Sequence, residues 1–162
     1  MSQDPDAPPP DPSTALAALM GRGGTHDDLE GKLIEGLPHA REIGLRLHSA
    51  AAGIAVLSVP YDPRLVGDPA TGVLHGGVVT TVLDTACGIA VMASEPQLVA
   101  TATLDLRIDY MRPATCDRAV WARAECYRLT RSIAFARAVA YHDTPETPVA
   151  SAAGAFILER AS

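Results

Sequence analysis

The sequence predicts an α+β domain in which an antiparallel sheet of about six strands wraps around one long central helix. Three observations carry this prediction. Two strand-like runs precede a single long apolar segment, and four follow it. The apolar segment is hydrophobic around almost its whole circumference, so a helix formed by it must be buried on nearly all sides. The links between the last strands are short and rich in turn residues, which favours consecutive antiparallel pairing.

Length and composition narrow the class of protein. The chain has 162 residues and a formal net charge of −6, with 48% apolar and 20% charged residues. This length suits one domain with a proper core, and the composition is too apolar for a disordered chain. A single Lys among the 13 basic residues argues against a nucleic-acid partner. No window is long and charge-free enough to span a bilayer, so we expect no membrane partner.

The cysteines and the N-terminus indicate the compartment. Cys87, Cys116 and Cys126 are odd in number and widely spaced, and none forms a CxxC pair. Reduced thiols explain this pattern better than a disulfide framework does. The N-terminus lacks the basic region and apolar run of a secretory signal. We therefore expect a cytoplasmic protein.

The first 26 residues are predicted to be a disordered or weakly ordered tail, followed by one domain over 27–160. The tail begins with a stretch rich in proline and aspartate and ends in a glycine-rich linker, neither of which can bury enough apolar surface to fold. The domain then opens with a helix over roughly 28–36, which an aspartate pair can cap and which Pro38 stops.

The predicted elements follow in order. Two strands over 44–48 and 54–59 are separated by a hairpin-like break at Gly53, and a loop over 60–72 leads to the long helix over 76–94. Four strand-like runs come after the helix: Val99–Tyr110, Ala119–Leu129, Ile133–His142 and Pro148–Leu158. The first of these alternates strictly between apolar and polar residues from Ala102 onward, which predicts one buried face and one polar face.

The most informative segment runs from Gly72 to Gly88, with the sequence GVLHGGVVTTVLDTACG. The pair Gly76 and Gly77 opens the helix. The first amide groups of a helix lack intrahelical partners and carry the positive end of its dipole. Glycine also lets a ligand come close to this backbone. Such a terminus can hold an anion, or a carbonyl oxygen that becomes anionic during a reaction.

Asp84 is the only charged residue of this helix and lies about two turns after its start. Burying a carboxylate is costly unless it has a partner or reaches solvent. Two interpretations stay open for it: a catalytic acid, or a structural acid bonded to Thr80 or Thr81. Two also stay open for His75: a site residue, or a group that caps the helix.

The sequence lacks the usual motifs of metal binding, serine nucleophiles and phosphate binding. The five histidines show no metal-ligand spacing, and no Cys–His cluster exists. Neither a GxSxG nucleophile elbow nor a phosphate-binding P-loop is present. We therefore expect no metal site.

Three motifs together closely resemble the phenylacetate-pathway (PaaI-like) acyl-CoA thioesterases of the hotdog-fold superfamily. They are the run from Gly72 to Gly77 followed by Asp84, the segment Thr103–Pro113 (TLDLRIDYMRP), and Arg131–Phe135 (RSIAF). The match covers roughly residues 38–158. The resemblance implies hydrolysis of acyl-CoA to free acid and CoA without a cofactor. It also implies a homodimer with one continuous sheet, paired again into a homotetramer.

The resemblance assigns roles to individual residues at a dimer interface. The Gly76 N–H polarises the thioester carbonyl, with Gly77 beside it, and Asp84 of the partner subunit acts as general base or nucleophile. His75 supports the geometry, and Thr103 orients water. The substrate-binding positions that it implies are Asp68, Thr81, Arg112, Pro113, Arg131 and Ser132.

The chain departs from the family pattern at Pro69, where many members carry Asn six residues before the His. Proline has no amide hydrogen to donate. Either Asp68 or a backbone group replaces this Asn, or the activity is weak. Thr130 likewise stands where members often have Gly. Two other functions stay open: a non-catalytic hotdog dimer that binds acyl-CoA, and a hydratase or dehydratase on the same fold.

Overall fold

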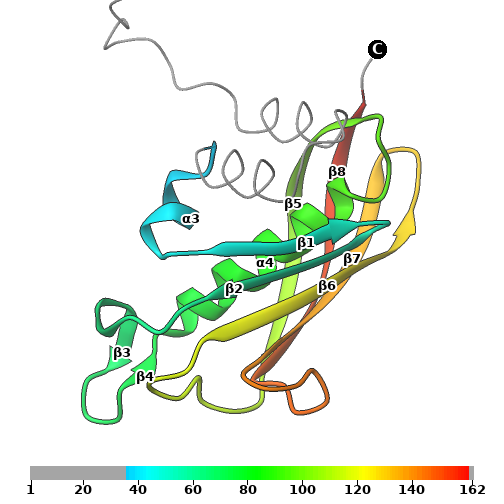
Figure 1. Cartoon of the computed structure of the whole chain (residues 1–162). Helices are drawn as coiled ribbons and strands as arrows, with labels where there is room; N and C mark the ends of the chain where they lie inside the picture. The colour runs from blue at the N-terminus through cyan, green and yellow to red at the C-terminus, as the bar shows by residue number, and fades with distance from the viewer. Residues whose placement is uncertain (1–35, 161–162) are drawn as a thin grey trace, which may run out of the picture.

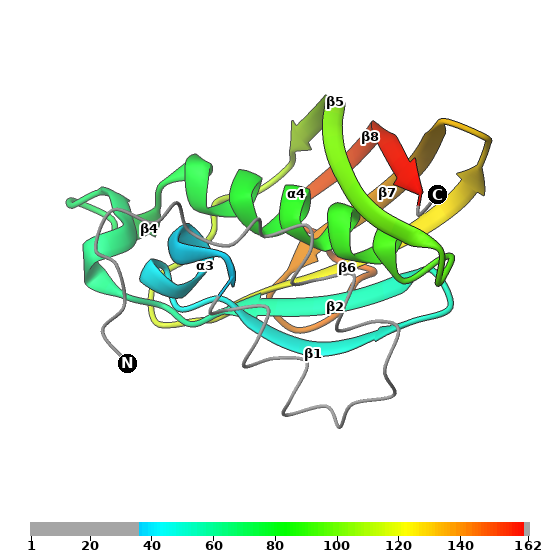
Figure 2. The same cartoon turned by 90° about the horizontal axis from the view of Figure 1, so that it is seen from above.

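The computed structural model describes residues 36–160. Six antiparallel strands form one curved sheet in the order β1-β2-β6-β7-β8-β5, and helix α4 (Gly76–Met92) lies against its concave side (Figures 1 and 2). The strands are β1 (Arg46–Ala51), β2 (Ile54–Val59), β5 (Leu98–Tyr110), β6 (Val120–Leu129), β7 (Ile133–Tyr141) and β8 (Ala150–Arg160). The predicted architecture is therefore confirmed.

Helix α4 is the centre of the core. It contacts all six strands of the sheet, as its nearly all-round apolar sequence predicts. Alanines on the facing side of β6 and β7 let the helix approach the sheet closely. Neither α4 nor another helix within residues 36–160 combines the length and apolar character needed to cross a membrane. The buried residues of α4 are Val78, Val79, Val82, Leu83, Ala86, Cys87, Ile89, Ala90, Val91 and Met92.

The N-terminal predictions are only partly within the described residues. The expected tail and the expected helix over 28–36 lie outside them, apart from position 36. Pro38 begins a short helix, α3 (Pro38–Glu42). At the first helical position the missing N–H of proline costs nothing, because that N–H would have no intrahelical partner.

The first two strands form a hairpin whose turn contains Ala52 and Gly53 with φ of 49° and 77°. Positive φ at both central residues is typical of the tight hairpin turns that match strand twist. The predicted loop over 60–72 contains additional structure. A 3₁₀ turn, η1 (Pro63–Leu65), leads into a small hairpin of β3 (Val66–Asp68) and β4 (Val73–Leu74), which delivers the chain to α4.

The expectation of consecutive strand pairing is wrong at one place. β6, β7 and β8 pair in sequence, but β5 pairs with β8 and not with β6. The connection over 111–119 is longer than a tight turn and carries the chain past α4 to β2, beside which β6 pairs. β5 is therefore left at an edge of the sheet.

The strict alternation in β5 is also interrupted. The register with β8 shifts between Thr103 and Asp105, so Leu104 is an extra, bulged residue and is 55% exposed. A bulge changes which face the following side chains occupy. Thr103 pairs with the buried Phe156 on the side of α4, and Leu106 returns to that same side after the bulge.

Candidate active site

His75 is the cap of helix α4. Its backbone is extended (φ −61°, ψ 135°), and its Nδ1 accepts a hydrogen bond of 2.9 Å from the Gly77 N–H. Its own N–H donates to the Leu65 carbonyl at 2.9 Å, which fixes the entry of the chain. A Cβ at position 77 would lie 2.9 Å from that Nδ1, so the cap requires glycine there. The capping interpretation of His75 is therefore confirmed.

The Gly76 amide is the free donor at the helix start. Within residues 36–160, no group accepts a hydrogen bond from its N–H. Its carbonyl oxygen, in contrast, accepts from the Tyr110 hydroxyl at 2.8 Å and from Thr80 Oγ1 at 3.2 Å. The peptide that contains this carbonyl is thus held in place. Because the N–H sits at the positive end of α4, it suits an oxygen that carries negative charge.

Tyr110 is a site residue for which the sequence alone predicts no role. Its hydroxyl also lies 2.7 Å from Thr80 Oγ1, and its hydroxyl oxygen and nearest ring carbons lie 3.4 and 3.6 Å from where a Cβ of Gly76 would stand. The Tyr110 and Thr80 hydroxyls have one hydrogen each, so when Tyr110 donates to the Gly76 carbonyl, Thr80 donates either to that carbonyl or to the Tyr110 oxygen. In the sequence, Tyr110 ends the strand with alternating apolar and polar residues. That alternation predicts a buried side chain, but it does not predict the hydrogen bond to the Gly76 carbonyl.

Asp84 is half-buried on the open side of α4. Its Oδ1 accepts a hydrogen bond of 2.8 Å from Thr103 Oγ1 on β5. The expected partners, Thr80 and Thr81, donate instead to the Gly76 and Gly77 carbonyls at 3.2 and 2.9 Å. That interpretation of Asp84 as bonded within its own helix is wrong, because threonine hydroxyls in helices reach back to the carbonyl four residues earlier.

The two chemical groups are too far apart to act together within one chain. Gly76 and Asp84 are separated by eight residues, which at 1.5 Å per residue is about 12 Å along the helix axis. The contacts on β5 show the same separation, because Tyr110, at the end of the strand, bonds to Gly76, whereas Thr103, nearer its start, bonds to Asp84. A single thioester carbonyl and its attacking water cannot span both.

Asp68 is bonded within its own turn. Its carboxylate accepts from the Ala70 N–H at 3.0 Å and the Thr71 hydroxyl at 2.6 Å. These hydrogen bonds, that from Thr71 first, lower the pKa of Asp68 below its usual value. It is Gly67, one residue earlier, that lies against the helix cap: a Cβ there would stand 2.7 Å from the His75 Cα.

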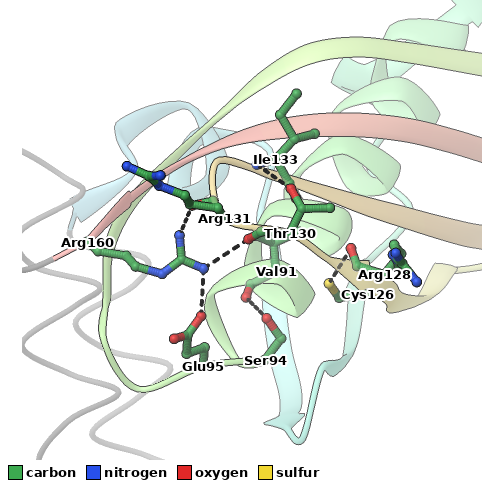
Figure 3. A network of polar contacts seen from close by, with 9 residues as sticks. All are labelled: Val91, Ser94, Glu95, Cys126, Arg128, Thr130, Arg131, Ile133 and Arg160. Carbon is green, nitrogen blue, oxygen red and sulfur yellow. Dashed lines mark hydrogen bonds and ion pairs between the residues drawn. The ribbon is translucent and has the colours of Figure 1, made fainter.

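The other expected substrate-binding residues fall at opposite ends of the chain's sheet. Arg112 and Pro113 line a cavity of about 300 Å³ beside the segment that bonds to Leu74, just before α4 begins. Arg131 lines a cavity of about 570 Å³ at the far end, next to the β6–β7 turn (Figure 3). One chain therefore does not bring Arg112 and Arg131 together.

Cys87 is not a candidate nucleophile. The thiol is fully buried in the core. Burial, with a further contribution from the Asp84 charge, raises the pKa of Cys87 to about 12. The thiol is therefore protonated at neutral pH, and the reactive form of cysteine is the thiolate.

Fold and site together define a hotdog protein of the thioesterase class. The family described as the thioesterase superfamily matches residues 71–149, which contain α4 and β5 to β7. The chain is 30% identical over 135 residues to the medium/long-chain acyl-CoA thioesterase YigI of Salmonella typhimurium, covering 75% of this chain and 86% of the relative. The chain belongs to the thioesterase superfamily.

Solved structures agree with this assignment. A protein from Pseudomonas aeruginosa superposes with a TM-score of 0.71 at 38% identity, covering 88% of this chain and 98% of that one. A mutant of the phenylacetic acid degradation protein PaaI from Thermus thermophilus gives a TM-score of 0.65 at 26% identity, covering 75% and 98%. The hotdog fold and the resemblance to PaaI-like proteins are confirmed.

Proposed function

We propose that this protein is an acyl-CoA thioesterase whose active site is shared between two copies of the chain. One observation carries the proposal: a free amide at Gly76 and an open carboxylate at Asp84 are both present, yet lie two turns apart. The acyl-CoA thioesterase activity of the YigI relative supports a CoA thioester as the substrate.

A single two-fold axis would complete the site. The midpoint between Gly76 and Asp84 on α4 is Thr80, and the midpoint between their contacts on β5, Tyr110 and Thr103, falls near Leu106. An axis that runs beside α4 and the free edge of β5, level with these two midpoints, would set β5 antiparallel to its copy and bring Asp84 toward Gly76 of the partner subunit. The helix and the strand thus favour the same axis.

The exposed edge of β5 supports this arrangement. Within residues 36–160, β5 is the longest strand, with 13 residues, and it pairs on one side only. Leu104, Tyr110 and Met111 expose 55%, 52% and 54% of their surface along it. Long apolar edge strands are normally covered, because they otherwise template aggregation. A second copy of β5 would cover this edge and continue the sheet.

The chemistry follows from the proposed geometry. The Gly76 N–H of the partner subunit would bind the thioester carbonyl oxygen as it becomes anionic, which for one such donor contributes roughly 3–4 kcal/mol. Asp84 would activate a water, or attack directly, and the Thr103 hydroxyl bonded to it would hold that water or carboxylate in position. The His75 cap, through Gly77, would keep the helix start rigid.

The same axis places the expected substrate contacts. Arg112 and Pro113 of the partner subunit would approach the start of β5, the end at which Arg131 and Ser132 lie. Thr81 and Asp68 would flank the helix start. We further propose, from the family resemblance, a cytoplasmic homodimer that pairs into a homotetramer.

Thiol release from acyl-CoAs tests the proposed activity. Incubated with aromatic, short, medium and long acyl-CoAs, the protein should release CoA from at least the medium and long chains. Tight calorimetric binding of an intact acyl-CoA without thiol release would favour a non-catalytic binding dimer, to which Pro69 points. Loss of the conjugated absorbance of an enoyl-CoA would indicate a hydratase.

Mixed dimers test whether the site is shared. Asp84→Asn and Gly76→Pro chains, each inactive alone, are co-expressed with different tags and purified as heterodimers. In a shared site, one of the two sites then receives both intact groups, and activity returns. If each chain held its own site, both would stay defective and the heterodimer would be as inactive as its parents.

A further inference from the structure

The cavity at the far end of the sheet is positively charged in an acidic protein. Its volume is about 570 Å³, and its lining residues come from the β6–β7 turn and the end of β8. Among residues 36–160, the lining residues are Thr130, Arg131, Leu158 and Arg160, two of them basic and none acidic. The whole chain has a net charge of −6, so this local balance is opposite to the overall one.

The two arginines of the cavity differ in their partners. Arg160 forms an ion pair of 2.9 Å with Glu95, and the two side chains are only 27% and 26% exposed. Arg131 is exposed, and no carboxylate within residues 36–160 lies at ion-pair distance from it. The charge of Arg131 is therefore the uncompensated one.

Arg160 also holds the turn that carries Arg131. Its guanidinium donates to the Thr130 carbonyl at 3.1 Å and to the Arg131 carbonyl (Figure 3). The third carbonyl of the turn, that of Ser132, accepts from the Leu158 N–H at 2.9 Å. All three carbonyls of this turn are thus engaged, which fixes the backbone from which the Arg131 side chain projects.

The cavity lies on the same side of the sheet as Asp84. Phe156, which pairs with Thr103, is buried beneath α4, and Leu158 and Arg160 follow it at alternate positions on that side. Four residues of extended strand span about 13 Å. The pantetheine arm of CoA, when extended, is longer than this, so the arm can join a thioester at Asp84 to phosphates at the cavity.

We propose that Arg160, anchored by Glu95, is a positioning residue that holds Arg131, a substrate-binding position already implied by the family resemblance, toward a phosphate group of the CoA nucleotide. This rests on the thioesterase function proposed above. A guanidinium binds phosphate through paired hydrogen bonds that depend on its orientation, so a fixed turn strengthens binding. Because Glu95 neutralises the charge of Arg160, Arg160 would serve to hold the turn, and the charge of Arg131 would remain available for the ligand.

Paired substrates test this proposal. KM and kcat are measured for an acyl-CoA and for the matching acyl-pantetheine, which lacks the nucleotide phosphates. Arg131→Ala and Arg160→Ala should each raise KM for acyl-CoA by about tenfold, as expected for one charged hydrogen bond, with kcat and the acyl-pantetheine parameters unchanged. Arg128→Ala, a nearby exposed arginine outside the cavity, is the matched control and should change neither.

Two outcomes would overturn the proposal. Equal effects of Arg131→Ala on both substrates, or none on either, would exclude a phosphate contact. An Arg160→Ala protein with unchanged KM but a lowered melting temperature would show a purely structural ion pair, and Glu95→Gln checks this with a milder change. Calorimetry with free CoA separates this test from the proposed function: weaker binding in both arginine variants supports the site even without turnover, and absence of binding to the unaltered protein refutes it.

Discussion

Asp84→Asn should lower kcat for acyl-CoA hydrolysis by about 10²–10⁴-fold, which is what a positioned general base contributes. Asparagine has nearly the same shape and keeps an oxygen that can accept from Thr103 Oγ1, which lies 2.8 Å from Asp84 Oδ1. What it loses is the negative charge and the ability to take a proton. KM should therefore stay nearly constant, because the substrate still binds while the transition state loses its base.

The measurement is steady-state thiol release, with circular dichroism to show that the variant is folded. Asp105→Asn is the matched control, since Asp105 is an exposed acid on β5, the strand that carries Thr103, and its side chain has no hydrogen bond to the site within residues 36–160. A rate for Asp84→Asn equal to that of this control would exclude Asp84 from the chemistry.

Gly76→Pro should remove the amide donor while leaving the helix intact. Proline is favoured at the first helical position, and the extended backbone of His75 (ψ 135°) suits the residue before a proline. The added Cβ would lie 3.4 Å from the Tyr110 hydroxyl, an ordinary contact. Loss of one oxyanion donor should then lower kcat by about 10²–10³-fold.

Gly76→Ala separates the donor from the added bulk. Alanine introduces the same Cβ beside Tyr110 but keeps the N–H. We expect the alanine variant to hydrolyse acyl-CoA at a rate within a few-fold of the unaltered protein. Proline and alanine variants of equal activity would show that the Gly76 amide does not bind the carbonyl oxygen.

Local rules predict much of this fold because α4 dominates it. The apolar pattern of the segment predicts a helix that is buried on nearly all sides, as α4 is, and the importance of the Gly–Gly start and of the lone Asp84 follows from helix chemistry alone. The PaaI-like motif implies roles for the site residues, and in the proposed dimer these roles would depend on a pair of chains. Nothing in local spacing shows which strand edge the second chain would use.

The missed features are tertiary. The bulge at Leu104 has no signature within β5, since it arises only in the register with β8, yet it turns Thr103 toward Asp84. The pairing of β5 with β8 likewise depends on a distant contact, because β6 pairs with β2 and not with β5. Tyr110 is visible in the sequence as an aromatic residue, but its bond to the Gly76 carbonyl requires the strand end and the helix start to meet.

The cap on α4 has a consequence for turnover. Because His75 occupies the Gly77 N–H, only the Gly76 N–H remains for a ligand oxygen. A thioester offers a single carbonyl oxygen and loses nothing by this. In the shared site proposed above, the carboxylate product would carry two equivalent oxygens and a full charge. It would meet one amide donor instead of two and would lie beside the carboxylate of Asp84, so the released acid should be a weak inhibitor.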